Sequence, residues 1–325
     1  MKVFVTGGAG YIGSVAASML LDAGWEVVVF DNLERGHRAA LDQRAQFIEG
    51  DLRRASDIEQ ALIDCRPAAV MHFAAYALVG ESMAQPELYF TNNTGGAVHL
   101  AEAMRKAKVR RLVFSSTCAT YGEPTSMPIT EETPQAPTNP YGDSKLMCER
   151  MFRWYAGVHG WQAVFLRYFN ACGAVGPRGE DHTPESHLIP NMLRVALGQT
   201  PHLQVFGDDY PTPDGTCIRD YIHIHDLARA HIMALDKQAD GAFNLGTGSG
   251  CSVKEVLETA RRVTGHAIPV KVMPRRPGDP PRLVADYSKA RDALGWQPEQ
   301  STMANIVRTA WAWHKAHPGG YTAPA

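Results

Sequence analysis

The sequence predicts an α/β protein whose main part is a doubly wound parallel sheet and whose C-terminal part is a smaller mixed α/β lobe. Three observations predict this fold class. Short apolar runs alternate with helix-length segments through the first half of the chain, as in βαβ units whose sheet is covered on both faces. A glycine-rich turn joins the first apolar run to the first helical segment. The second half is less regular, with a Gly- and Pro-rich loop over 171–185.

Each expected element follows from a run of residues with a recognisable period. In the first half, apolar runs bounded by turn residues predict strands at 2–6, 26–30, 45–49, 68–73, 111–116 and 163–168. Helices are expected between them, at 11–23, 55–64, 82–106 and 141–158. In the second half we expect helices at 187–197, 225–235, 252–263 and 301–315, and strands at 203–206, 242–245 and 270–273. Two domains are expected, 1–170 and 171–325, with some later segments returning to the first.

The overall composition argues against several classes of protein. The 325 residues carry 32 Lys and Arg against 34 Asp and Glu, a net charge of −2. A sequence-independent nucleic-acid binder would need a basic surplus to displace counterions from phosphates. With 45% apolar and 20% charged residues, the chain is not disordered. Its six cysteines include no CxxC pair, so we expect free thiols and a reducing, cytoplasmic environment.

The first strand leads into a turn that contains four glycines, at positions 7, 8, 10 and 13. Residues 3–21 carry no charge and reach membrane-span length. The glycines interrupt this run, so we expect neither a membrane segment nor a secretory leader. Glycine permits a tight turn, a close approach of the backbone to a pyrophosphate and the packing of helix on strand. The N-terminus of the helix then directs N–H groups at the phosphates.

An acidic residue completes this pattern. Asp31 ends the second strand, 18 residues after Gly13, where a carboxylate is suited to bind the ribose diol of an adenosine. The same carboxylate would repel a 2′-phosphate, so NAD is favoured over NADP, although Arg35 and Arg38 follow closely. The turn and the carboxylate together predict a Rossmann dinucleotide site.

A second group of residues indicates acid–base chemistry. Tyr141 and Lys145 project from one face near the start of a helix, while Ser115-Ser116-Thr117 ends the fifth strand, at the edge where ligands of such sheets bind. Lowering a tyrosine pKa from ~10 to ~7 takes about 4 kcal/mol, and a cation about 4 Å away supplies a similar amount. Lys145 and a cationic nicotinamide together would therefore activate Tyr141 as a base toward a sugar alcohol.

Two further motifs are interpreted as structural. Residues 246–250 read Gly-Thr-Gly-Ser-Gly after a short strand, but no acidic partner follows at the right distance, so we interpret them as a turn before the next helix. His223, His225 and Asp226 have the residue types of a metal site, yet no further ligand is evident nearby in the sequence. We interpret them as a strand-to-helix junction, and no metal site is expected.

Taken in order, the motifs of this chain resemble those of the UDP-glucose 4-epimerases, a family of the extended short-chain dehydrogenase/reductase superfamily. The resemblance spans nearly the whole chain. Its motifs are Thr-Gly-Gly-Ala-Gly-Tyr-Ile-Gly at 6–13, Asp-Asn at 31–32, Gly-Asp-Leu at 50–52, His-Phe-Ala-Ala at 72–75, Val-Gly-Glu-Ser at 79–82, Tyr-x-x-x-Lys at 141–145, Arg-Tyr-Phe-Asn at 167–170, the run 214–223 and Arg-Pro-Gly-Asp at 276–279.

The resemblance implies a reaction, a cofactor and an assembly. NAD would be held tightly, and Tyr141, assisted by Thr117, would take the proton of the 4-hydroxyl of a UDP-sugar while hydride passes to the nicotinamide. The 4-keto sugar would turn over and receive the hydride on its opposite face, which interconverts UDP-glucose and UDP-galactose. Residues 1–170 would bind NAD and 171–325 the UDP-sugar. Two chains would form a homodimer through the helices at 82–106 and 141–158.

The resemblance also assigns residues, position by position. The NAD-binding set is Gly7, Gly10, Tyr11, Ile12, Gly13, Asp31, Asn32, Asp51, Leu52, Phe73, Ala74, Ala75, Asn92, Ser115, Tyr141, Lys145 and Tyr168. The substrate set is Thr117, Asn170, His187, Leu188, Phe206, Arg219, Tyr221, Arg276, Asp279 and Leu283. In this set, Arg219 and Arg276 would clamp the diphosphate. Asp279 would meet the uridine ribose, and Phe206 would lie near the uracil.

Three positions leave open how tightly NAD is held and which sugar the substrate carries. Ala77 stands where some members carry a lysine that contacts the cofactor, so NAD retention would be weaker. His187 stands where some members carry an asparagine that contacts the sugar. Leu283 matches a gatekeeper that excludes N-acetylated sugars when it is a large tyrosine and admits them when it is small, and leucine is intermediate.

The sequence leaves two related epimerase activities open and argues against two other functions. A UDP-xylose/UDP-arabinose 4-epimerase is a close alternative, since residues 115–122 also suit pentose members, and a UDP-N-acetylhexosamine 4-epimerase is another. A sugar-nucleotide dehydratase or decarboxylase would need an acid just after Thr117, where Cys118 and Ala119 stand. A non-catalytic NAD-sensing protein would not need the Tyr141–Lys145 pair.

Overall fold

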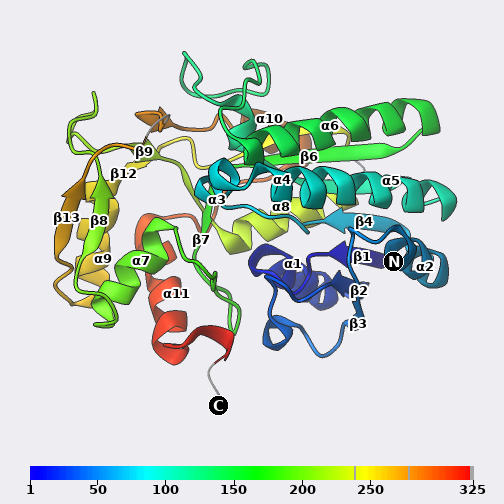
Figure 1. Cartoon of the computed structure of the whole chain (residues 1–325), viewed down its shortest axis with the longest axis horizontal. Helices are drawn as coiled ribbons and strands as arrows, with labels where there is room; N and C mark the ends of the chain where they lie inside the picture. Colours follow the sequence, from blue (N-terminus) through cyan, green and yellow to red (C-terminus); the bar gives the residue numbers. More distant parts are fainter. Residues whose placement is uncertain (238, 277–278, 323–325) are drawn as a thin grey trace.

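The computed structural model describes residues 1–237, 239–276 and 279–322, and its main feature is a seven-stranded parallel sheet (Figure 1). The strand order is β11-β6-β5-β4-β1-β2-β3. The strands are β1 (Lys2–Thr6), β2 (Glu26–Asp31), β3 (Gln46–Glu49), β4 (Ala69–His72), β5 (Arg111–Thr117), β6 (Gln162–Tyr168) and β11 (Gly241–Leu245). The order reverses between β1 and β4, where ligands of doubly wound sheets bind. The predicted sheet is confirmed.

Helices cover both faces of this sheet because its strands are apolar on both sides. In β1, Val3 and Val5 point into one core and Phe4 into the other, as the two-residue period of a strand requires. The helices on the first face are α1 (Tyr11–Asp22), α8 (Ile224–Asp236) and α10 (Ser288–Leu294). Those on the second face are α2 (Ala55–Cys65), α5 (Gly96–Lys106) and α6 (Pro140–His159).

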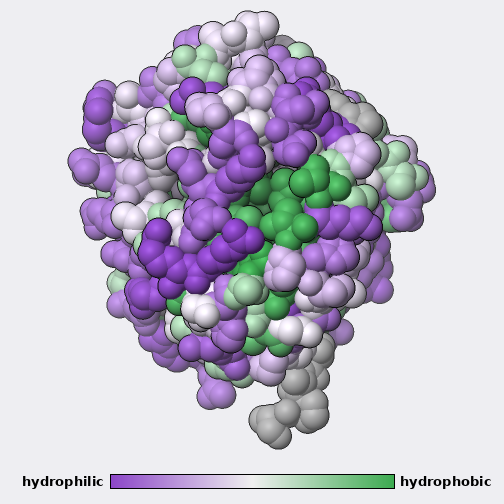
Figure 2. All heavy atoms as spheres, turned by 90° about the vertical axis from the view of Figure 1, so that its left-hand side faces the viewer, coloured by the Kyte–Doolittle hydropathy of each residue, from purple (hydrophilic) through white to green (hydrophobic). Residues whose placement is uncertain are grey.

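The smaller lobe has a core of its own and lies on the left side of Figure 1. Its helices are α7 (Leu188–Ala196), α9 (Val253–Thr264) and α11 (Met303–Ala316). Its strands form short ladders: β8 (Leu203–Phe206) with β13 (Val270–Met273), β7 (Asn170–Cys172) with β10 (Tyr221–His223), and β9 (Ile218–Arg219) between β12 (Cys251–Ser252) and β14 (Arg282–Leu283). Seen from this side, an apolar area of the surface lies between strongly polar ones (Figure 2).

The prediction of one continuous helix at 82–106 is wrong. The chain instead forms α3 (Val79–Ala84), α4 (Pro86–Tyr89), a π-helical segment η2 (Phe90–Gly95) and then α5. Proline disfavours helical backbone in the residue before it, and Gln85 accordingly leaves the helix with a φ of −139°. Three short 3-10 turns complete the described elements: η1 (Arg38–Ala40), η3 (Cys118–Tyr121) and η4 (Gly320–Thr322).

The strand expected at 242–245 forms, but it does not belong to the smaller lobe. It is β11, which pairs in parallel with β6 and extends the main sheet. Helices α8 and α10 join the same core, so three segments beyond residue 171 return to the first domain. The two- and three-residue strands of the smaller lobe were not predicted, since such short runs show no period. No helix in the described parts of the chain is long and apolar enough to cross a membrane.

Candidate active site

One large cavity lies between the main sheet and the smaller lobe. Its volume is about 1890 Å³, and residues from both parts of the chain line it. Every residue that the sequence analysis assigns to the cofactor, to catalysis or to the substrate lies on its wall. The structure therefore brings the two predicted sets together around a single space. In the motif at 276–279, Pro277 and Gly278 lie outside the described residues.

The glycine turn between β1 and α1 is shaped by contacts that exclude any side chain. Gly7 has a φ of +70°, and a Cβ atom there would lie 2.4 Å from the backbone nitrogen of Ala74. A Cβ atom on Gly13 would lie 2.2 Å from the carbonyl oxygen of Gly7. Helix α1 begins after Gly10, and none of the described side chains caps it. Its first N–H groups are therefore available to an anion, and the turn fits a pyrophosphate.

Asp31, at the end of β2, is held by the backbone around it. One carboxylate oxygen accepts a hydrogen bond from the N–H of Ala9 at 3.0 Å and the other from that of Leu33 at 2.9 Å. Burial raises the pKa of Asp31, and these two N–H groups oppose the rise. Nearby Arg35 forms an ion pair with Glu81 at 2.7 Å. Because that guanidinium already has an internal anion, the site fits NAD better than a 2′-phosphate.

Asp51 and Asn32 lie next to each other beyond the ends of β3 and β2. The Arg53 guanidinium hydrogen-bonds to Asp51 at 2.6 Å and lowers the pKa of that carboxyl to about 2. The side-chain amide of Asn32 also donates to Asp51, at 3.4 Å. Leu52 is buried and a Cβ atom on Gly96 would meet its side chain at 3.0 Å, which fixes this wall of the cavity.

The predicted acid–base residues meet where β5 ends and α6 begins. Asn139 caps α6 by accepting the N–H of Gly142 at 2.9 Å, which places Tyr141 in the first turn. One turn later, the Lys145 ammonium donates to the carbonyl oxygen of Ser115 at 2.8 Å. Burial lowers the pKa of Lys145 to about 8. Thr117, the last residue of β5, lines the cavity beside them.

The phenol of Tyr141 is buried in a wall rich in hydroxyl groups. Burial raises its pKa above the ordinary tyrosine value, the nearby Tyr168 raises it further, and a hydrogen bond with Thr117 opposes the rise. Tyr168 hydrogen-bonds to the Ser115 hydroxyl at 2.5 Å. Burial therefore works against deprotonation of Tyr141, and a cation that binds in the cavity would favour deprotonation.

The substrate end of the cavity contains charged side chains that pair with one another. Arg219, in β9, forms a short ion pair with Asp279. The guanidinium of Arg276 lies 4.0 Å from the centre of the Phe206 ring, in a cation–π contact. Leu283 lies directly beside Arg219, because β14 pairs with β9. Two arginines, a carboxylate and an aromatic ring at one end of the cavity suit a nucleoside diphosphate.

The remaining assigned residues also line this cavity. The list comprises Tyr11 and Ile12 at the start of α1, Phe73, Ala74 and Ala75 after β4, Asn92 in η2, Asn170 in β7, His187 and Leu188 at the start of α7, and Tyr221 in β10. Their positions on the wall agree with the assignment, and their individual contacts with ligands stay predictions.

The two motifs interpreted as structural have internal partners. In the turn at 246–250, the N–H groups of Thr247 and Gly248 donate to the carboxylate of buried Asp220 at 2.8 and 3.0 Å, so this anion site is already filled from within. His223 ends β10 and accepts the N–H of His225, the second residue of α8. This confirms the interpretation of residues 223–226 as a strand-to-helix junction.

Sequence reasoning missed one group of residues in the cavity wall. Glu180, His182 and Glu185 surround His187, the one member of the group that was assigned. Burial would lower the pKa of both imidazoles, but the carboxylates raise the pKa of His182 to about 9 and that of His187 to about 10. The alternating acids and histidines of the sequence Glu-Asp-His-Thr-Pro-Glu-Ser-His were the available signal.

Comparison with known proteins agrees with this geometry. Residues 3–246 match the NAD dependent epimerase/dehydratase family. The chain is 50% identical over 327 residues to the UDP-glucose 4-epimerase of Lacticaseibacillus casei, covering 99% of both chains.

Two solved structures are similar over nearly their whole length. One is the UDP-glucose 4-epimerase from Brucella ovis in complex with NAD, with a TM-score of 0.92, 46% identity and coverage of 96% of this chain and 97% of that one. The other is the UDP-glucose 4-epimerase from Bifidobacterium longum in complex with NAD⁺ and UDP, with a TM-score of 0.94, 39% identity and coverage of 98% and 100%. The chain therefore belongs to the NAD dependent epimerase/dehydratase family and, within it, to the UDP-glucose 4-epimerase group.

Proposed function

We propose that the chain catalyses the NAD-dependent inversion of C4 in a UDP-sugar, with the interconversion of UDP-glucose and UDP-galactose as its main reaction. One observation carries the proposal. The acid–base group of Tyr141, Lys145 and Thr117 lines the same cavity as the glycine turn and the arginines of the substrate end. A base, a dinucleotide site and a diphosphate site around one space suit the oxidation and re-reduction of a sugar hydroxyl.

The cofactor of this proposal is NAD, which supplies a hydride acceptor and donor when it is bound. Its pyrophosphate would lie over the turn at Gly7, where the backbone leaves room for it. Asp31 would receive the adenosine ribose, because each of its oxygens keeps a lone pair beside the one used by the backbone. The adenine would lie near Asp51 and Leu52.

Tyr141 is the proposed acid–base residue. Its deprotonated oxygen would accept the proton of the sugar 4-hydroxyl, and the phenol so formed would return a proton after the sugar has turned over. Thr117 would hydrogen-bond to the same oxygen of the sugar and orient it. Lys145 would orient the phenol and favour its deprotonated form. Since burial works against deprotonation of Tyr141, the positive charge of the bound nicotinamide ring is the remaining source of activation.

When the UDP-sugar binds, the charged side chains of the substrate end would leave their internal partners and contact the ligand. Arg219 would turn from Asp279 toward the diphosphate, and Asp279 would accept hydroxyl groups of the uridine ribose. Arg276 would supply the second guanidinium, and Phe206 would lie against the uracil. Asn170, His187, Leu188, Tyr221 and Leu283 would enclose the hexose and its linkage. Residues 1–170 would thus bind mainly the cofactor and 171–325 mainly the sugar nucleotide.

We also propose a homodimer in the cytoplasm. Helix α6 exposes Met147, Trp154 and Val158, and residue Trp154 is 77% exposed. These three positions are 7 and 4 residues apart and so form one stripe along the helix. Helix α5 packs beside α6 and exposes Val98. Two copies could bury these apolar stripes against each other. The six free thiols suit a reducing compartment.

A panel of nucleotide sugars tests the proposed function. Purified protein would be incubated with UDP-glucose, UDP-xylose or UDP-N-acetylglucosamine, without added reductant, and the C4 configuration of the products followed by NMR. We expect UDP-glucose to be inverted fastest. A faster reaction of the pentose or of the N-acetylated sugar would transfer the proposal to that substrate. Accumulation of a dehydrated or decarboxylated product, or no turnover of any sugar, would contradict it.

A further inference from the structure

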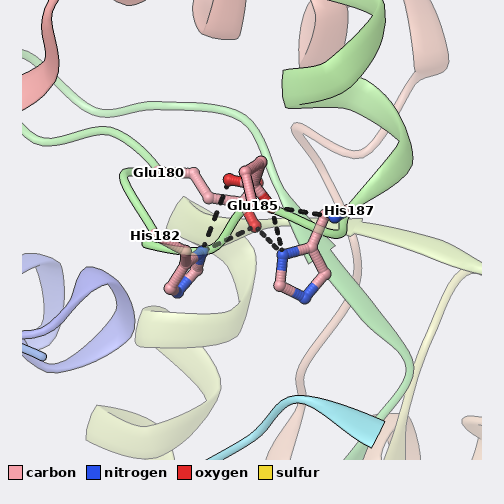
Figure 3. A group of neighbouring side chains, drawn as sticks. All are labelled: Glu180, His182, Glu185 and His187. Carbon is pink, nitrogen blue, oxygen red and sulfur yellow. Dashed lines mark hydrogen bonds and ion pairs between the residues drawn. The ribbon is translucent and has the colours of Figure 1, made fainter. Parts of the chain in front are cut away.

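Four potential metal ligands gather in the segment that joins β7 to α7. They are Glu180, His182, Glu185 and His187, and their ligand atoms lie within 4.8 Å of one another. Figure 3 shows the two imidazoles and the two carboxylates turned toward a common centre. All four come from eight consecutive residues, so the local course of the backbone determines their arrangement. The acid–base roles proposed above do not involve this cluster.

The four nitrogen–oxygen distances within the cluster lie near those of a tetrahedral coordination shell, and all of its ligand atoms lie within 4.8 Å of one another. The Nδ1 atom of His187 lies 3.0 Å from a carboxylate oxygen of Glu180 and 2.9 Å from one of Glu185. The Nδ1 atom of His182 lies 3.5 Å and 3.7 Å from oxygens of the same two residues. Ligands about 2.0 Å from a tetrahedral ion stand roughly 3.3 Å apart, close to the middle of this range.

Two polar atoms of the cluster lack hydrogen bonds although they are buried. The Glu185 side chain is only 1% exposed. One of its oxygens accepts the N–H of His187 at 2.8 Å, whereas Oε2 has no hydrogen-bond partner among the described residues. The Nδ1 atom of His182, which faces it, is also without one. The two atoms face each other only as a long ion pair of 3.7 Å. A buried carboxylate oxygen without a hydrogen bond is costly, and a cation at the centre of the cluster would satisfy both atoms.

We propose that Glu180, His182, Glu185 and His187 bind one divalent transition-metal ion, with Zn²⁺ as the ion that their chemistry fits best. Two imidazole nitrogens and two carboxylate oxygens are ordinary Zn²⁺ ligands in tetrahedral sites. Mg²⁺ and Ca²⁺ prefer six or more oxygen ligands. Four protein ligands leave no open position for a substrate, so the ion has a structural role.

The position of the cluster indicates what this ion stabilises. The neighbouring carbonyl oxygen of Thr183 accepts a hydrogen bond from Arg35 of the main domain at 2.7 Å. The carbonyl oxygen of Asp181 interacts with the His37 ring at 3.1 Å. The segment therefore bridges the loop after β2 and the start of α7. A bound ion would hold this part of the cavity wall in place between the cofactor and substrate ends.

The test measures binding of Zn²⁺ itself and does not depend on the proposed reaction. Untagged full-length protein, dialysed against EDTA and then against metal-free buffer, would be titrated with Zn²⁺ in competition with a chromophoric chelator. We expect about one ion per chain and a higher Tm with Zn²⁺ than with EDTA. The double variant His182→Gln/Glu185→Gln should bind at least about 100-fold more weakly, since even changes in outer-shell partners cost 10–100-fold.

Two controls complete the test. The double variant His266→Gln/Glu132→Gln changes the same residue types at exposed positions and should bind like the wild type. If the cluster variant does not fold, the visible absorption spectrum of Co²⁺ bound to the wild-type chain tests the site instead. A tetrahedral site gives intense absorption, and an octahedral one does not. Binding of far less than one ion per chain, equal binding by the cluster variant or an octahedral Co²⁺ spectrum would each overturn the proposal. The cluster would then be a set of ion pairs between carboxylates and imidazolium groups.

Discussion

The two ends of the cavity satisfy their polar groups in different ways. At the cofactor end, backbone atoms form the binding surface: the glycine turn leaves no room for a side chain at Gly7, and Asp31 is fixed by two N–H groups. At the substrate end, charged side chains satisfy one another through the ion pair of Arg219 and Asp279. The first end is therefore preorganised, whereas the second must exchange internal partners for a ligand. This contrast suits a retained cofactor and a substrate that enters and leaves.

The largest effect is expected from Tyr141→Phe, which removes the acid–base hydroxyl between the two ends. We expect kcat to fall by about 10³-fold or more, since a positioned acid–base group contributes 10²–10⁴-fold. NAD content should stay unchanged, because the cofactor end is built mainly from backbone. Coupled detection of UDP-galactose would give kcat, and the absorbance of the released cofactor its content. A variant with wild-type turnover would remove Tyr141 from the proposed mechanism.

The preorganised end is tested by Gly7→Ala. A methyl group there would lie 2.4 Å from the Ala74 nitrogen, and the alanine backbone would have to keep a left-handed conformation. We expect NAD affinity to fall by about 100-fold, the factor that about 2.7 kcal/mol produces.

Gly24→Ala is the matched control for this change. Gly24 also has a positive φ, of +79°, but a Cβ atom there would meet nothing within 4 Å. The Gly24→Ala variant should lose about as much stability through backbone strain as the Gly7→Ala variant does, but it should keep the NAD affinity of the wild type. Equal NAD affinities of the two variants, measured by fluorescence titration, would contradict the role given to the turn.

The exchangeable end is tested by Arg219→Gln. Loss of a charge-assisted hydrogen bond to a phosphate costs about 1.5–3 kcal/mol, so we expect KM for UDP-glucose to rise by roughly 10- to 100-fold. NAD content should not change. Steady-state kinetics on protein of known cofactor content would separate effects on substrate binding from effects on NAD binding. A variant that lost NAD while keeping its KM would contradict the assignment of Arg219 to the substrate end.

Lys145 leads to a prediction about pH. Burial lowers its pKa to about 8, so the ammonium is present below that pH and is lost as the pH rises above it. We expect kcat to fall as the pH rises through about 8. In Lys145→Arg, whose guanidinium stays charged above pH ~12, that fall should disappear even if the overall rate is lower. A wild-type kcat that stays constant well above this pKa would contradict the electrostatic role of Lys145.

The smallest effect is expected from Trp154→Glu, which lies outside both ends. A charge on the exposed stripe of α6 should dissociate the proposed homodimer, which sedimentation velocity would detect. We expect kcat and KM to change by less than about 3-fold, since most surface substitutions alter stability by under ~0.5 kcal/mol. A wild-type dimer that persists in this variant would place the interface elsewhere.

The same contrast explains what could be predicted from the sequence. The cofactor end depends on local patterns, because the turn at 7–13, the strand that ends at Asp31 and the Tyr141–Lys145 spacing each lie within one short segment. The substrate end depends on pairings between distant segments. Residue 219 meets residues 279 and 283 only because β9 and β14 are neighbours, and two-residue strands leave no period in the sequence.

Other differences have equally definite causes. The expected helix at 82–106 ends early because Pro86 does not tolerate a helical Gln85. The strand at 242–245 was predicted, but its sheet was not, since partner choice is a tertiary property. The cluster around Glu185 was not predicted because its residues lie in an irregular segment between β7 and α7, where no period in the sequence shows that the backbone turns the four side chains together.

The central claim is that hydride leaves C4 and returns to it inside one cavity, with Tyr141 handling only the hydroxyl proton. Its most direct test uses UDP-glucose that carries deuterium at C4, with the UDP-galactose formed analysed by NMR and mass spectrometry. We expect the deuterium to stay at C4 of the product, without exchange with water or with added NADH. Loss of the deuterium to solvent would show that C4 is inverted through removal of its proton, and would contradict the hydride mechanism.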